Sequence, residues 1–125
     1  MSAGRGKHRL IADAIIVGTD IIVTIYGGNR PHIGSVAVAV PRPSLINAAK
    51  TSSTSSVYNF LSHKDEVIAR LFADRLAAGL NCNTVVTAGV HIKNINDEDL
   101  DLVQANAGRL CDDLMQKVGR YLAIL

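Results

Sequence analysis

The sequence has little aromatic and cysteine content: in 125 residues there are no tryptophans, three tyrosines, two phenylalanines and two cysteines. So few aromatic rings offer no series of stacking platforms for single-stranded nucleic acid. Cys82 and Cys111 lack the CxxC spacing of a structural zinc site or a dithiol redox centre. We therefore expect two reduced, buried thiols, as is typical of cytoplasmic proteins.

Long hydrophobic runs are also absent. Gly18, Thr19 and Asp20 interrupt the most apolar stretch before it reaches the roughly 18 residues of a membrane span. The first ten residues, MSAGRGKHRL, are basic but contain no apolar signal core. These features predict a soluble cytoplasmic protein that has no membrane partner.

Neither positive nor negative charge is in large excess. The net charge is +2, and three of the thirteen positive charges lie in residues 1–9, which leaves ten against eleven acids without that segment. Binding to duplex nucleic acid by counterion release needs more positive charge than this, so we expect no nucleic-acid partner. Residues 1–64 nevertheless hold seven Lys or Arg and two acids, so a local anion site is compatible with the sequence.

Hydrophobic residues make up 48% of the chain, which is enough to bury one compact core. We expect a single domain over residues 10–125. Residues 1–9 are broken by glycines and offer little to pack, so they are predicted to form a basic, flexible and dispensable tail.

Several β-branched runs predict strands. Residues 11–17 and 21–26 form a predicted hairpin, and residues 34–40 form a third strand whose valines and small residues alternate. The PRPS sequence at 41–44 is predicted to leave the sheet, because proline donates no hydrogen bond to a ladder. The TSSTSS sequence at 51–56 predicts a loop leading into a fourth strand at 57–61, with a polar strand face as the alternative for its hydroxyls.

Two amphipathic helices complete the prediction. The first begins at Ser62, with Asp65 in an imperfect capping box, and ends at Gly79 or Asn81; a fifth strand at 84–92 then runs parallel to the fourth. The second helix has Asn96 as its N-cap and an apolar stripe that runs from Leu100 to Tyr121. The fold class is α+β: a mixed, mostly antiparallel sheet of about five strands, with two helices. If both helices cover one face, a second copy is the simplest cover for the other, so we expect a homodimer.

Three basic loops could hold an anion: residues 27–32, 41–44 and 62–64. Ordinary turns and a helix cap are the alternative reading of the same loops. Three histidines, His32, His63 and His91, lie at predicted element ends, but no pair has the i, i+4 spacing of metal ligands, so we expect no metal. No GxSxG or GxGxxG motif is present, and we identify no catalytic set.

Three segments, GGNRPHIGSVAVAVPRPS, SSVYNFLSHKDE and TAGVHIKNINDEDL, together resemble a known family. This family is the small D subunit of gallate-type hydroxyarylic acid decarboxylases, described as prenylated-flavin chaperone-like. The resemblance covers roughly residues 11–118 and implies a fold similar to proteasome-assembly-chaperone domains. The positions that fall on its motifs are Gly28, Pro31, His32, Gly34, Arg42, Pro43, Ser44, Ser56, His63, Lys64, Gly89 and His91.

The resemblance implies an accessory, non-catalytic protein. It would bind or deliver prenylated FMN, or FMN, to the large subunit of a UbiD-type decarboxylase, and Arg42 and Lys64 would together hold the flavin phosphate. One alternative is a small enzyme acting on a phosphorylated or carboxylated substrate, with His32 or His63 as the acid or base. Another is an assembly chaperone whose exposed sheet face binds protein and no cofactor.

Overall fold

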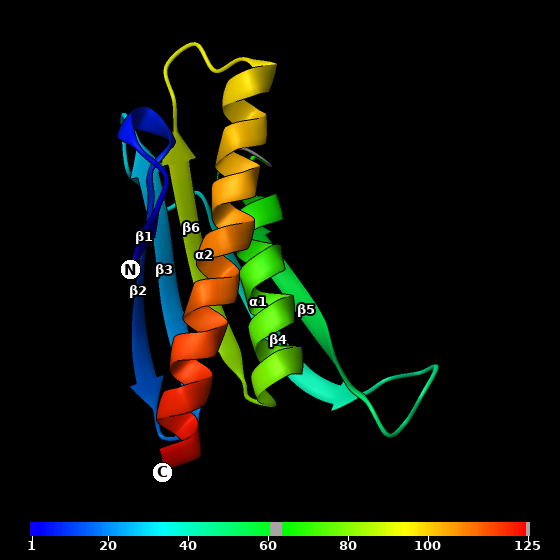
Figure 1. Ribbon diagram of the computed structural model, residues 1–125. Helices are drawn as coiled ribbons and strands as arrows, with labels where there is room; N and C mark the ends of the chain where they lie inside the picture. Colours follow the sequence, from blue (N-terminus) through cyan, green and yellow to red (C-terminus); the bar gives the residue numbers. More distant parts are fainter. Residues whose placement is uncertain (61–63, 125) are drawn as a thin grey trace.

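One mixed sheet carries two helices on a single face. A computed structural model describes residues 1–60 and 64–124. Its strands occur in the order β1-β2-β3-β6-β4-β5, with α1 and α2 packed side by side on one face (Figure 1). The predicted α+β class is confirmed, and a two-residue strand at the N-terminus makes the sheet six-stranded. The elements are β1 (Ser2–Ala3), η1 (Gly6–His8), β2 (Leu10–Val17), β3 (Asp20–Gly28), β4 (Ser35–Pro43), β5 (Thr51–Asn59), α1 (Glu66–Leu80), β6 (Thr84–His91) and α2 (Asp97–Ile124).

The sheet consists of two hairpins joined by β6. The β2–β3 hairpin turns at Gly18, whose φ of 65° suits glycine. β6 pairs parallel with β3 and antiparallel with β4, and β4 pairs antiparallel with β5. β5 and β6 therefore run parallel within one sheet, as predicted for a crossover through α1, with β4 lying between them.

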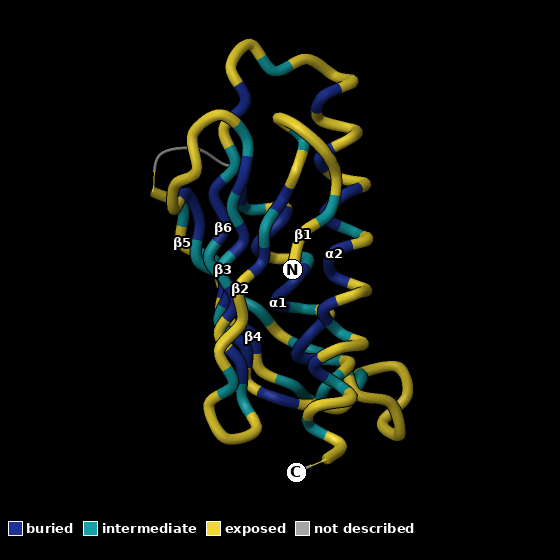
Figure 2. Tube along the Cα trace, turned by 60° about the vertical axis from the view of Figure 1, so that its left-hand side comes forward, coloured by how far each residue is buried: buried dark blue, intermediate teal, exposed yellow. Residues whose placement is uncertain are grey.

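The core lies between the sheet and the helices, where the dark blue segments face one another in Figure 2. On β4 the small side chains Ala37 and Ala39 are buried against α1, which lets the helix approach closely, whereas Val38 and Val40 point to the other face. We call this other face, opposite the helices, the outer face. The largest fully buried apolar side chains are Phe72, Leu10, Ile21, Ile25, Leu76, Leu110, Val23 and Val86.

β4 and β5 are longer than predicted. β4 continues through the two prolines to Pro43, and β5 begins at Thr51, so the PRPS and TSSTSS segments pair with each other instead of forming loops. The partner on the other side of β4, β6, ends its pairing at Ala39. Pro41 and Pro43 lie two residues apart, so both missing donors face the same side, and that side is open to solvent.

The helix ends follow local signals. Asn81 ends α1 with a φ of 52°, as predicted, but α1 begins at Glu66, and the predicted cap Ser62 lies outside the described residues. At the start of α2 the Asn96 side chain accepts the Asp99 N–H at 2.8 Å, and the Asp99 carboxylate accepts the Asn96 N–H at 3.2 Å. Neither helix in the described part of the chain is both long and apolar enough to cross a membrane.

Residues 1–9, the N-terminal segment, lie against β2, β3 and α2. The Met1 ammonium donates to the Ala12 carbonyl at 2.9 Å, and the Asn106 side chain donates to the His8 carbonyl at 2.8 Å. The His8 ring lies 2.7 Å from the Asp99 carboxylate. This placement differs from the flexible tail expected from the sequence, because the segment pairs with β2 and its partners on α2, Asp99 and Asn106, lie about a hundred residues away in the chain.

Candidate functional site

A loop at residues 29–34, the crossing loop, defines one end of the sheet. β3 and β4 follow each other in the chain but lie on opposite sides of β6, so the connection between them has to cross β6. Hydrogen bonds fix both ends of the loop to that strand. The Asn29 N–H donates to the His91 carbonyl at 2.7 Å, and the Gly34 N–H donates to the Ala88 carbonyl at 2.9 Å.

Two glycines make this crossing possible. The backbone of the loop passes so close to β6 that a Cβ on Gly89 would overlap the carbonyl group of His32. A Cβ on Gly34 would likewise overlap the carboxylate of Asp65. Both positions belong to the motifs singled out in the sequence, and the structure gives them a steric role.

The buried carboxylate of Asp65 ties the crossing loop to the start of α1. Its side chain is only 4% exposed; one oxygen accepts the Val90 N–H at 2.9 Å, and the other lies 3.2 Å from Nε2 of His32. Nδ1 of His32 lies 3.1 Å from the Arg30 carbonyl. Both ring nitrogens of His32 therefore have a partner within the chain. Sequence reasoning treated Asp65 only as a capping residue and missed this contact.

An open cleft of about 350 Å³, the outer cleft, lies on the outer face beside the crossing loop. Thr24 of β3 and Thr87 of β6 are register partners on its floor, and Pro31, His32 and Ile33 form its wall. Tyr26 also lines it and donates to the Asp13 carboxylate at 2.7 Å, a hydrogen bond that raises the pKa of the tyrosine. Its size lies within the range of small-molecule sites.

The structure gathers one group of predicted site residues at this end of the sheet. Pro31 and His32 line the outer cleft, and Gly34 lies against Asp65. Gly28, with a φ of 80°, pairs with His91 where β3 and β6 end. Lys64 is exposed and directly precedes Asp65 in the chain, while His63 lies outside the described residues.

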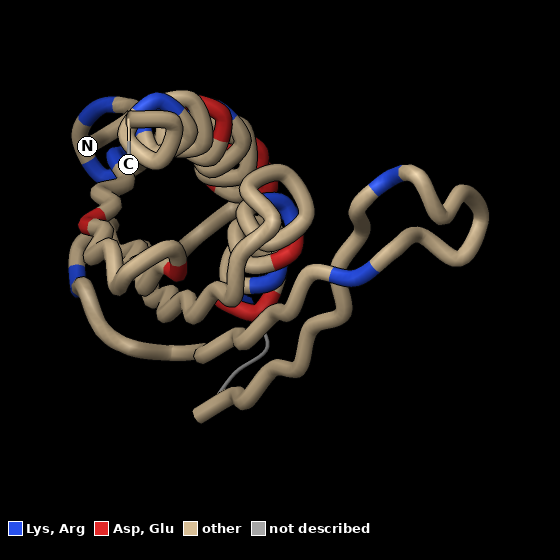
Figure 3. Tube along the Cα trace, turned by 90° about the horizontal axis from the view of Figure 1, so that it is seen from below, with Lys and Arg blue, Asp and Glu red and all other residues tan. Residues whose placement is uncertain are grey.

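Arg42 and Ser44 lie at the opposite end. Arg42 is seven residues beyond Ser35 on β4, roughly 23 Å along an extended strand. Its Nε donates to Thr54 at 2.6 Å, and the Ser44 hydroxyl accepts the Ile46 N–H at 3.2 Å within the loop of residues 43–51, which extends away from the body of the molecule (Figure 3). A single chain therefore does not bring Arg42 and Lys64 to one phosphate.

Ser56 lies apart from both groups. It is exposed on the outer face of β5, opposite Val38 of β4. Its register partner is therefore apolar and carries no charge.

The two thiols are unreactive, and the described residues form no metal-holding cluster. Cys82 and Cys111 are free and buried, and burial raises the pKa of both thiols, that of Cys111 to about 11. Such thiols stay protonated and unreactive at neutral pH. Within residues 1–60 and 64–124, no three His, Cys, Asp or Glu side chains come close enough to hold a metal ion.

Comparison with known proteins identifies the family. The model of the prenylated flavin chaperone LpdD-like domain matches residues 4–119. The chain belongs to this family. Protein LpdD of Lactiplantibacillus plantarum is 27% identical over 107 residues, which cover 86% of this chain and 72% of that protein. The LpdD-like range includes the crossing loop, the outer cleft and strands β2 to β6, so the resemblance seen in the sequence motifs is confirmed.

Proposed function

We propose that the protein binds prenylated FMN as cargo in the outer cleft and delivers it to the large subunit of a UbiD-type aromatic acid decarboxylase in the cytoplasm. It acts as a non-catalytic carrier. The observation that carries this proposal is the outer cleft itself, a site of about 350 Å³ within the LpdD-like range, bordered by the motif residues Pro31 and His32.

The chemistry of the outer cleft suits a planar, partly polar ring. The hydroxyls of Thr24 and Thr87 offer donors and acceptors on a flat strand surface, and His32 offers a further polar group at the wall. The next row of the outer face is apolar, because Ile22, Val85 and Val38 are register partners across β3, β6 and β4. That row suits the extra hydrocarbon that prenylation adds to a flavin.

The remaining candidate residues have supporting roles in this proposal. Gly28, Gly34 and His91 shape the end of the sheet that holds the crossing loop, and Lys64 supplies a positive charge near its contact with α1. The cleft is open, which favours release of cargo to a partner enzyme. An enclosed site would favour turnover within the protein.

We also propose that the protein is a homodimer in which the outer faces of two copies meet. Both helices cover the inner face of the sheet. On the outer face, opposite the helices, large apolar side chains of β2, β3 and β4 are exposed. Contiguous apolar surface of this kind marks an interaction site on a folded protein. The exposed side chains are Ile15, Val17, Ile22, Val38 and Val40.

The carrier function is tested by flavin binding and transfer. Enzymatically prenylated FMN and plain FMN are titrated against the protein anaerobically, and the loaded protein is mixed with the apo large subunit. We expect Thr87→Phe, which fills the floor of the outer cleft, to weaken flavin binding at least tenfold. We also expect the loaded wild type to restore decarboxylation.

A matched control places the same aromatic side chain away from the outer face. Gln116 is exposed on α2 and lies outside the outer cleft, so Gln116→Phe should leave flavin affinity within twofold of wild type. An equal loss of flavin affinity in both variants would mean that the flavin does not bind in the outer cleft. A wild-type protein that binds neither flavin and restores no activity would contradict the carrier function.

A further inference from the structure

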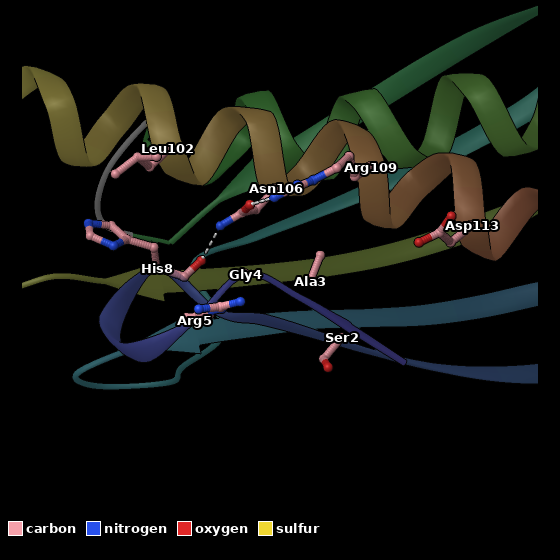
Figure 4. Close-up of a pocket in the computed structure, with 9 residues that line it drawn as sticks. All are labelled: Ser2, Ala3, Gly4, Arg5, His8, Leu102, Asn106, Arg109 and Asp113. Atoms are coloured by element: carbon pink, nitrogen blue, oxygen red, sulfur yellow. Dashed lines mark hydrogen bonds between the residues drawn. The ribbon is translucent and has the colours of Figure 1, made fainter.

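A second and larger cleft, the N-terminal cleft, lies between the N-terminal segment and α2. Its volume is about 530 Å³, and it shares no lining residue with the outer cleft. Figure 4 shows residues of the N-terminal segment on one side and residues of α2 on the other. Two arginines line it, Arg5 from the N-terminal segment and Arg109 from α2.

Arg109 turns towards this cleft although an acid is available on its own helix. Asp113 follows it by four residues, a spacing at which opposite charges on a helix commonly pair. Arg109 instead donates to the Asn106 side chain, and in Figure 4 it extends towards Asn106 while Asp113 lies apart from it. The guanidinium charge therefore remains without a carboxylate partner among the described residues.

Arg5 is also unneutralised. Across residues 1–60 and 64–124 its side chain makes no hydrogen bond or ion pair, and it is exposed at the mouth of the cleft. Two other arginines do have acidic partners, since Arg75 pairs with Asp112 and Arg70 lies 3.9 Å from Glu66, whereas Arg9, Arg30, Arg42 and Arg120 form no ion pair with the described residues. The N-terminal cleft thus combines two guanidinium groups whose charges are not balanced within the chain.

The lining between the two arginines is held in place. Asn106 is only 4% exposed; its amide donates to the His8 carbonyl at 2.8 Å and its oxygen accepts from Arg109. Gly4 has a φ of 87°, and a Cβ there would overlap the Asn106 amide, so the segment packs directly on that side chain. His8 is already engaged by Asp99, which leaves the two arginines as the positively charged lining residues available to a ligand. Such preorganisation lowers the entropy lost on binding.

We propose that the N-terminal cleft binds a phosphomonoester, with Arg5 and Arg109 as its charged ligands and Asn106 as the residue that positions Arg109. A guanidinium donates two parallel hydrogen bonds to phosphate oxygens, which favours a phosphate over a single-point anion. The carboxylate of Asp113 disfavours an anion near it, so the phosphate lies at the Arg5 and Asn106 end of the cleft.

The direct test uses inorganic phosphate as the probe, followed by amide chemical shifts of the full chain. Phosphate should shift the Gly4, Arg5 and Arg109 amides and the Asn106 side-chain amide in a saturable way. Arg5→Gln and Arg109→Gln should each weaken binding at least tenfold, as expected for loss of a charge-assisted contact. Arg9→Gln removes the same charge from the same segment but not from the cleft lining, and should retain wild-type affinity.

Two further measurements distinguish a loss of binding from a loss of folding, and a flavin phosphate from the phosphate of another ligand. Arg5 has no partner to lose, so a wild-type melting temperature for Arg5→Gln shows that its effect is on binding. FMN and riboflavin differ only in the phosphate. A preference for FMN that disappears in Arg109→Gln assigns the phosphomonoester to the flavin and moves the cargo from the outer cleft to the N-terminal cleft, because the two clefts share no lining residue. Equal binding of the two flavins assigns the phosphomonoester to a different ligand.

Failure of the N-terminal cleft and failure of the carrier function are distinguishable. Absence of phosphate-dependent shifts at the cleft, or equal affinities in Arg5→Gln, Arg109→Gln and wild type, would overturn the site even if flavin binds elsewhere. If the higher affinity for FMN than for riboflavin is lost in Arg42→Gln, the flavin phosphate binds near Arg42 and not in the N-terminal cleft. Phosphate binding at the cleft without any flavin binding would support the site and contradict the carrier function.

Discussion

At Gly89 the backbone of β6 lies directly against the crossing loop, and a side chain has no room there. The loop is held from both sides, by hydrogen bonds to β6 and by the contact of His32 with the buried Asp65. A residue without a side chain therefore sets the position of the three residues, Pro31, His32 and Ile33, that form the wall of the outer cleft.

Replacing Gly89 with alanine should displace the crossing loop and lower the free energy of unfolding by about 2 kcal/mol or more, because the added methyl group overlaps backbone atoms. Gly108→Ala is the matched control. A Cβ at Gly108 on α2 meets nothing within 4 Å, and alanine favours helix, so its stability should equal or exceed that of wild type. Chemical denaturation of both variants measures this; a neutral Gly89→Ala would contradict the close crossing.

At the scale of elements, turns and helix caps whose partners lie within a few residues could be predicted from the sequence. Contacts between residues far apart in the chain could not. The turn at Gly18 and the cap at Asn96 form as predicted because their partners lie within three residues. The extension of β4 through Pro43 was missed, because proline was weighed as a sheet breaker and the open side of β4 depends on where β6 ends. That extension is also what separates Arg42 from Lys64.

The candidate site was predictable to a similar extent. Its glycines and His32 stood out as motif positions, whereas Asp65 did not, because its two partners come from the crossing loop and from β6, about 25 to 33 residues away in sequence. The N-terminal cleft was missed for the same reason. Its walls are separated by about a hundred residues, and no local pattern in the first nine residues indicates that they pack on α2.

The N-terminal segment should therefore contribute to stability. A chain lacking residues 2–9 loses the β1 ladder and the hydrogen bond from Asn106 to His8, and we expect its melting temperature to fall by at least about 4 °C. The double variant Arg5→Gln, Arg9→Gln keeps these backbone contacts and the ion pair of Lys7 with Asp99, and should melt close to wild type. Unchanged melting of the truncated chain would show a dispensable tail.

This contribution should depend on pH. The contact with His8, together with the Asn96 N–H and Lys7, lowers the pKa of Asp99 in the folded state. Stabilisation from a lowered carboxyl pKa is present above the unfolded value of roughly 3.9 and is lost as the pH falls through the folded value. The difference in melting temperature between the full and truncated chains should thus narrow below about pH 4. A constant difference would mean that Asp99 plays no part.

At the scale of the whole molecule, the two faces of the sheet differ sharply. One is covered by α1 and α2, and the other exposes apolar side chains in a row that begins at Ile15 and Ile22 and continues through Val38. The outer cleft contains the next row of side chains, that of Thr24 and Thr87. A second copy that binds to the apolar row would therefore lie beside the proposed cargo.

The homodimer proposal predicts a sedimenting species of twice 13.3 kDa at micromolar concentration. Val38→Lys places a charge in the middle of the outer face, where Val38 is 47% exposed, and should give monomers because burying that charge is costly. Gln116→Lys adds the same charge to an exposed position of α2 and should leave the dimer intact. A wild-type species of 13.3 kDa would contradict the proposal.

The central place of β6 also bears on how the chain reaches this structure during synthesis. The β2–β3 and β4–β5 hairpins are complete by residue 59, yet neither pairs with the other, since β6 at residues 84–91 lies between them. The two hairpins therefore cannot join into one sheet before β6 emerges from the ribosome and pairs with both. Until then the edges that β6 covers in the native sheet have no partner within the chain, so we expect misassembly with other chains to be favoured before β6 is available.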